Sequence, residues 1–82
     1  MTYTVLWSPA ALQKFSELPP HTAMIVDRAV IRLAERGEGD LRWVAPYHRL
    51  RAGRDEVALR FDKQEQTIHV LFLYLPLPRR SE

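Results

Sequence analysis

The stretch "EVALRFDKQEQTIHVLFLYL", residues 56–75, carries the two clearest strand patterns of the chain. Apolar side chains occupy every second position of 56–62, which predicts a strand with one buried face. The polar "KQEQ" at 63–66 predicts a turn. The segment 67–75 is apolar on both faces, as in a central strand. Its regular alternation predicts two sets of residues on opposite faces, namely Ile68, Val70, Phe72 and Tyr74 against His69, Leu71, Leu73 and Leu75.

The preceding stretch "YHRLRAG", residues 47–53, has the same period of two, with Leu50 alternating with Arg49 and Arg51. If Leu50 points into a core together with the apolar face of the next strand, the arginines point to the other side of the sheet. We therefore expect Arg49, Arg51 and Arg60 to share one sheet face.

Two helices are predicted near the N-terminus, over 8–18 and from Pro20 to about residue 36. Ser8 is a preferred N-cap residue, and Pro9 fits the first helical position because its missing N–H has no intrahelical partner there. Gly37 is a plausible residue to end the second helix. The expected apolar faces are Ala11, Leu12, Phe15 and Leu18 in the first helix, and Ala23, Val26, Ala29, Val30 and Leu33 in the second.

With "TYTVLW" (2–7) as a first strand, the predicted order is β-α-α-β-β-β. This order predicts an α+β fold in which two helices pack on one face of a small, mostly antiparallel four-stranded sheet. The other face of the sheet is then open. At 82 residues the whole chain, 1–82, is expected to form a single domain.

The charge is uneven along the chain. Residues 1–40 hold four basic and five acidic side chains, whereas residues 41–82 hold eight basic and five acidic ones. Ten of the twelve cations are arginine, whose planar fork suits phosphate and carboxylate. A basic half favours an anionic partner, either nucleic acid or an acidic protein segment.

Several classes of site are excluded by composition. The chain has no cysteine, which excludes disulfides, thiol catalysis and cysteine-bound zinc. It has no phosphate-binding glycine loop, no HExxH motif and no paired-carboxylate metal site, so we expect neither metal nor cofactor. The longest apolar run, "VLFLYLPLP", is too short to span a bilayer, and "MTYTVLWSP" lacks the basic start of a secretion signal. We expect a cytoplasmic protein without a membrane partner.

The arrangement resembles the RelE/ParE superfamily of bacterial type II toxins. "YTVLWSPAALQKFSELP" looks like the opening strand and first helix of that family, and "IVDRAVIRLAERG" looks like its second helix. "YHRLRAGRDEVALRFDKQEQTIHVLFL" is similar to its hairpin and central strand. The resemblance covers about residues 3–75.

The resemblance implies one of two activities. RelE-like members cut messenger RNA in the ribosomal A site, with basic residues on the open sheet face and no metal. ParE-like members poison DNA gyrase. Both kinds of toxin are neutralised by a cognate antitoxin that wraps the toxin in a hetero-oligomer.

The match to the family is incomplete. Arg49 and Arg51 correspond to basic positions of the family, but its hairpin arginine falls on Glu56, which reverses the charge. A shift of the turn would pass that role to Arg54 or Arg60. The tyrosine near the end of many such nucleases has no counterpart in this sequence.

Cleavage of RNA by its own 2′-OH needs a proton acceptor, charge stabilisation and a proton donor. Arginine stays protonated, so Arg49, Arg51 and Arg60 are assigned to hold phosphate. His69 is the preferred proton carrier, because alternation places His48 on the helix-covered side. Further RNA contacts are assigned to Tyr47, Arg54, Arg79 and Arg80.

Three functions remain open at this point. The first is ribosome-dependent mRNA cleavage with the ribosome and mRNA as partners, which the basic strand face favours. The second is inhibition of DNA gyrase, and the third is a catalytically silent module that only binds its antitoxin. Glu56 and the missing tyrosine favour these two alternatives. In the plainest structural interpretation the arginines are solvated or pair with antitoxin carboxylates.

Overall fold

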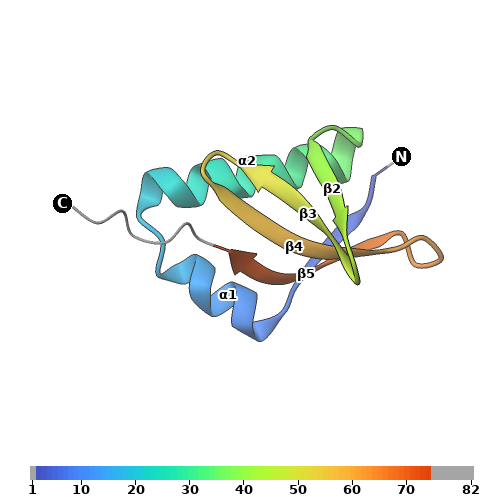
Figure 1. Cartoon of the computed structure of the whole chain (residues 1–82), viewed down its shortest axis with the longest axis horizontal. Helices are drawn as coiled ribbons and strands as arrows, with labels where there is room; N and C mark the ends of the chain where they lie inside the picture. Colours follow the sequence, from blue (N-terminus) through green and yellow to red (C-terminus); the bar gives the residue numbers. More distant parts are fainter. Residues whose placement is uncertain (1, 75–82) are drawn as a thin grey trace.

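The computed structural model describes residues 2–74, which form two helices and a five-stranded sheet in the strand order β1-β5-β4-β3-β2 (Figure 1). β1 pairs with β5 in parallel, and the other neighbouring strands are antiparallel. The elements, in chain order, are β1 (Thr4–Trp7), α1 (Pro9–Ser16), α2 (Pro20–Arg36), β2 (Asp40–Val44), β3 (Tyr47–Ala52), β4 (Asp55–Asp62) and β5 (Thr67–Tyr74).

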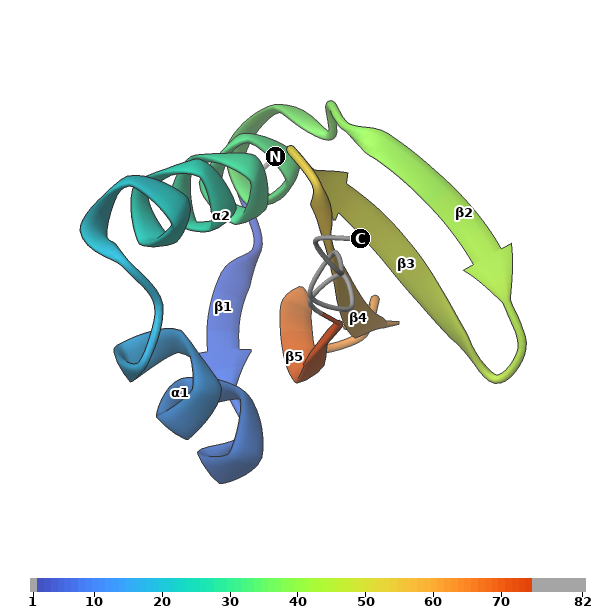
Figure 2. The same ribbon diagram turned by 60° about the vertical axis from the view of Figure 1, so that its left-hand side comes forward.

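The predicted α+β class is confirmed, and both helices lie on the same side of the sheet (Figure 2). The predicted count of four strands is wrong, because Asp40–Val44 forms a fifth strand along the outer edge of β3. This strand is only five residues long, and it ends at Val44, two residues before Pro46. Its stability comes from pairing with β3, which local propensity does not report.

The start of α1 and the end of α2 lie where their capping residues predict, whereas α1 ends at Ser16 and not at Leu18 as predicted. The Ser8 side chain accepts a hydrogen bond from the Ala11 N–H at 3.0 Å, which satisfies one of the free donors of the first turn of α1. At the C-terminal end of α2, Gly37 adopts a left-handed conformation with φ 69° and donates its N–H to the Leu33 carbonyl at 2.9 Å.

The apolar face of α1 is rotated from the predicted one. Ala11 is fully buried, whereas Leu12, predicted to belong to the apolar stripe, is 55% exposed. The small Ala11 side chain is the one that packs into the core cluster, while Phe15 packs against Trp7 with ring centroids 4.9 Å apart. The prediction for Leu12 is therefore wrong.

The core lies between the two helices and the sheet. Each fully buried leucine, isoleucine or valine contributes about 1.5–3 kcal/mol by removing its side chain from water. The members of this cluster are Ala11, Val26, Val30, Leu33, Ala34, Leu50, Ala52, Val57, Leu59, Ile68 and Val70.

A β-bulge interrupts the pairing of β4 with β5. Leu59 is opposite Val70, but Ala58 is opposite Phe72, so Leu71 is an extra residue on β5. The bulge is held from the start of α1: the Ser8 hydroxyl donates to the Leu71 carbonyl at 2.7 Å, and the Ser8 N–H donates to the Val70 carbonyl at 2.9 Å.

The bulge changes which side chains share a face. Ile68 and Val70 are buried under the helices as predicted. After the extra residue, Phe72 and Tyr74 point to the opposite side, the same side as His69. The regular alternation predicted for this strand is therefore wrong beyond Val70.

Within residues 2–74, neither helix combines the length and the apolar composition needed to cross a lipid bilayer.

We expect Ser8→Ala to lower the free energy of unfolding by about 1–2 kcal/mol, because it removes both the helix cap and the bond to the bulge. Chemical denaturation followed by circular dichroism measures the change. Ser16→Ala is the matched control, since the Ser16 hydroxyl makes a single exposed bond to the Gln13 carbonyl. Equal effects of the two substitutions would contradict the role given to Ser8.

Candidate functional site

The side of the sheet away from the helices is a helix-free face among residues 2–74. Strand pairing arranges its residues in two parallel rows that cross β2, β3, β4 and β5. The first row is Arg42, Arg49, Ala58 and Phe72, and the second row is Asp40, Arg51, Glu56 and Tyr74. The phase predicted for β3 and β4 thus places Arg49 and Arg51 together on this face.

Glu56 lies among the three arginines of these two rows. Its carboxylate is within 2.9 Å of the Arg42 guanidinium, 3.3 Å of that of Arg49 and 3.8 Å of that of Arg51. The Glu56 side chain is only 19% exposed, so water screens these pairs less than pairs on an open surface. One carboxylate thus partly neutralises three guanidinium groups, and the face carries less free positive charge than its arginine count indicates.

Aromatic rings cover the other half of the two rows. The Phe72 ring centroid lies 6.1 Å from that of Tyr47 and 6.4 Å from that of Tyr74. The Arg49 guanidinium carbon sits 4.2 Å from the centre of the Tyr74 ring, in cation–π geometry. Phe72 is 44% exposed, which leaves part of its ring open to a ligand.

Arg49 joins the charged and aromatic halves of the face. Its terminal nitrogen binds Glu56 and its plane lies over Tyr74, while its Nε is buried without a hydrogen-bond partner. A buried donor left unsatisfied costs free energy.

Arg60 and His69 lie on the same face but at its far end. They are opposite each other on β4 and β5, and His69 is also opposite Leu6 on β1. Arg60 is four residues from Glu56 along β4, which corresponds to about 13 Å. The predicted residues Arg49, Arg51, Arg60 and His69 therefore share a face but form two clusters along it.

The remaining predicted residues lie elsewhere. Arg54 is exposed in the turn between β3 and β4 and has no ion pair among residues 2–74. His48 is on the helix side as predicted, between the rings of Trp43 at 4.9 Å and Phe61 at 5.2 Å. Arg79 and Arg80 lie outside the described residues. In the part of the chain that the structure describes, no three His, Asp or Glu side chains gather as metal ligands.

Phe72 is the main residue of this face that sequence reasoning missed. Regular alternation put it on the side of Val70, and only the bulge at Leu71 turns it over. A helix cap that also binds a strand carbonyl leaves no pattern in the sequence of that strand, so the signal for this change was absent.

No protein-family model matches the chain, and no curated protein sequence does so either. Solved structures do match. A chain of the toxin–antitoxin complex RelBE2 from Mycobacterium tuberculosis is 23% identical, with a TM-score of 0.73, over 93% of this chain and 100% of that one. A chain of the archaeal RelE–RelB complex from Pyrococcus horikoshii OT3 is 16% identical, with a TM-score of 0.75, over 96% and 100% of the two chains.

The isolated E. coli RelE toxin is 16% identical, with a TM-score of 0.72, over 99% of this chain and 89% of that one. Such matches along almost the full length of both chains decide the architecture. This chain has the RelE fold. The resemblance inferred from the sequence is thereby confirmed at the level of the fold, and the helix-free face described above is a face of a RelE-like sheet.

We expect Glu56→Gln in this RelE-like chain to strengthen binding to polyanions, because it releases the guanidinium groups of Arg42, Arg49 and Arg51. The variant should elute from a heparin column at higher salt than the unsubstituted protein. Glu65→Gln, in the exposed turn before β5, makes the same change in net charge and is the control. If both variants shift equally, Glu56 does not restrain the arginines.

Proposed function

We propose that this chain is the toxin of a toxin–antitoxin pair and that its helix-free face binds RNA, with ribosome-dependent cleavage of messenger RNA as its activity. The observation that carries the proposal is the joined arrangement of arginines and aromatic rings across that face. Rings stack on bases and guanidinium groups bind phosphate, which is how single-stranded RNA is commonly recognised. The RelE fold supports the proposal, since the matching structures are of RelE toxins, alone or with RelB.

The two clusters of the face suit different tasks. Near Tyr74 and Phe72, a base stacks on the rings while Arg49 and Arg51 bind the adjoining phosphate in place of Glu56. At the far end, Arg60 neutralises the phosphate that reacts and His69 transfers the proton. RNA would then lie along the strands, from the aromatic rings towards His69.

The reaction itself balances without a further reactant. The 2′-oxygen attacks the neighbouring phosphorus, its proton passes to a base, and the bond from phosphorus to the 5′-oxygen breaks. The 5′-oxygen takes up a proton and the phosphorus remains in a 2′,3′-cyclic phosphate. Arg60 stabilises the extra charge on the phosphate oxygens in the transition state. His69 is the one side chain assigned to carry a proton at this end of the face. Because this set of groups is small, the ribosome is expected to hold the mRNA in position for the reaction.

The partners of the chain follow from the same proposal. They are a cognate antitoxin, the ribosome and its mRNA, all met in the cytoplasm. A metal or cofactor is not required by the steps above.

Inhibition of DNA gyrase is the second candidate, and the ion pairs of Glu56 favour it. A face whose arginines are already paired with a carboxylate is suited to a protein partner as well as to RNA. A supercoiling assay with purified gyrase separates the two candidates, since the nuclease leaves supercoiling unchanged.

We expect Arg49→Ala combined with Arg51→Ala to reduce mRNA cleavage on translating ribosomes by at least about a hundredfold, because two charge-assisted contacts to phosphate are lost. The fold should be intact, as both side chains lie outside the core. Lys14→Ala combined with Lys63→Ala removes the same charge from α1 and from the β4–β5 turn and is the control. Sequencing of RNA 5′ ends measures the cuts.

Full cleavage by the double arginine variant would reject the role of these residues. Absence of cleavage by the unsubstituted protein, together with loss of gyrase supercoiling, would replace the nuclease with the second candidate.

A further inference from the structure

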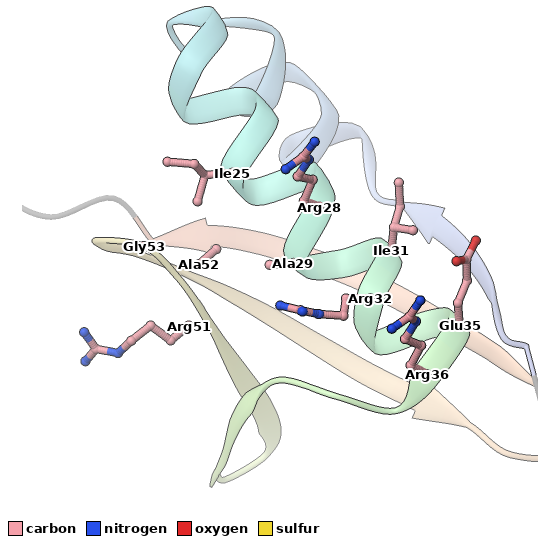
Figure 3. Close-up of a pocket in the computed structure, with 10 residues that line it drawn as sticks. All are labelled: Ile25, Arg28, Ala29, Ile31, Arg32, Glu35, Arg36, Arg51, Ala52 and Gly53. Carbon is pink, nitrogen blue, oxygen red and sulfur yellow. The ribbon is translucent and has the colours of Figure 1, made fainter.

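A second surface of the molecule combines positive charge with an apolar floor. It is an open groove of about 550 Å³ between α2 and the end of β3, on the side of the molecule where the helices pack (Figure 3). One wall is α2, and the other is formed by Arg51, Ala52 and Gly53.

Three arginines form a ladder along the α2 wall. Arg28, Arg32 and Arg36 are spaced four residues apart, so each lies about 6 Å further along the helix than the last (Figure 3). Like charges at this spacing weaken a helix. Arg32 pairs with Glu38 at 3.4 Å, but among residues 2–74 no carboxylate is within ion-pair distance of Arg28 or Arg36. Repulsion between these arginines lowers the stability of α2 in the isolated chain, which suggests that they serve to bind a partner.

The lining of the groove narrows the choice of ligand. The lining includes four arginines and a single carboxylate, that of Glu35. The guanidinium groups of the three arginines of the ladder project from α2, whereas that of Arg51 points away from the helix (Figure 3). Ile25 and Ile31, also in the lining, are 36% and 42% exposed and project from different sides of α2 (Figure 3). A nucleic-acid backbone offers phosphates but no apolar groups for these side chains, whereas an amphipathic peptide offers both carboxylates and apolar side chains.

Gly53 brings the two walls of the groove together. It has φ +66°, which favours glycine, and a Cβ built at this position would lie 3.1 Å from Cγ2 of Ile25. A larger residue here would be strained at this φ and would crowd the Ile25 side chain, which would have to shift by a few tenths of an ångström. The close approach keeps the apolar floor continuous from the helix to the strand.

We propose that this groove binds an acidic amphipathic segment of a partner protein, with its carboxylates on Arg28, Arg32 and Arg36 and its apolar side chains on Ile25 and Ile31. The inference deepens the proposed function, on which it rests for the existence of a protein partner. It assigns that partner to a surface distinct from the RNA-binding face.

Arg51 belongs to both surfaces. It lines the groove, and its guanidinium also lies 3.7 Å from Asp40 and 3.8 Å from Glu56. An acidic segment that reaches Arg51 therefore competes with the helix-free face for this side chain, and the two ligands should weaken each other.

The test uses the full chain and two probes. The first probe is a fluorescent helical peptide of roughly 14 residues, about 21 Å long, with glutamates on one face and leucines on the other. A peptide of the same composition in scrambled order controls for charge alone. The second probe is single-stranded oligouridylate of about 10 nucleotides. Fluorescence anisotropy measures both affinities.

Two charge-matched variants are compared. The ladder variant carries Arg28→Gln, Arg32→Gln and Arg36→Gln, and glutamine keeps the helix propensity of α2. The face variant carries Arg42→Gln, Arg49→Gln and Arg60→Gln, which lie on the helix-free face. Circular dichroism melts check folding, and the single substitution Arg32→Gln provides a milder second test of the ladder.

We expect the ladder variant to bind the peptide at least about tenfold more weakly and the RNA within about twofold of the unsubstituted protein. The face variant should show the opposite pattern. Loss of RNA rather than peptide binding in the ladder variant would make the groove a nucleic-acid site, and equal binding of the scrambled peptide would remove the role of the apolar floor. Either result, or no peptide binding at all, overturns the proposal. Peptide binding without any RNA binding would instead reject the proposed function and keep the groove.

Discussion

The hydroxyl of Ser8 makes the contact on which the character of this molecule depends. It caps α1 and at the same time binds the Leu71 carbonyl at the β-bulge of β5. Because side chains alternate along a strand, one extra residue turns every later side chain to the opposite face. Ile68 and Val70, before the bulge, fill the core, whereas Phe72 and Tyr74, after it, lie on the helix-free face.

The consequence is a sheet face on which arginines and aromatic rings meet. Without the phase change, β5 would bring His69 and leucines to this side, and Arg49 would have no ring beneath it. With the change, Arg49 lies between the Glu56 carboxylate and the Tyr74 ring. Glu56 keeps the guanidinium groups close together against their mutual repulsion, and under the proposed function it is also the group that the phosphate of RNA would displace. The same carboxylate therefore organises the face and restrains it.

The parts of this arrangement that depend on local sequence pattern could be predicted from the sequence. The period of two in β3 and β4 predicted the shared face of Arg49, Arg51 and Arg60, and the caps at Ser8 and Gly37 predicted where α1 begins and where α2 ends. Sequence reasoning missed β2, whose stability comes from pairing with β3, and it misplaced Phe72, because a bulge is set by a tertiary bond. Leu12 was misassigned because a two-turn helix permits two similar apolar faces, and only packing selects Ala11. The groove beside α2 was beyond reach, since it depends on how closely Gly53 approaches Ile25.

The character of the helix-free face depends on the phase of β5 after Leu71, which nuclear Overhauser contacts of the Phe72 ring can measure. Residues opposite each other on antiparallel strands have Cβ atoms about 5 Å apart, well within range of such contacts. We expect strong cross-peaks from the Phe72 ring to the Ala58 methyl group and to the Tyr47 ring. Cross-peaks to the methyl groups of Val57 and Leu59 in their place would put Phe72 on the core side of the sheet and rule out the phase change at Leu71.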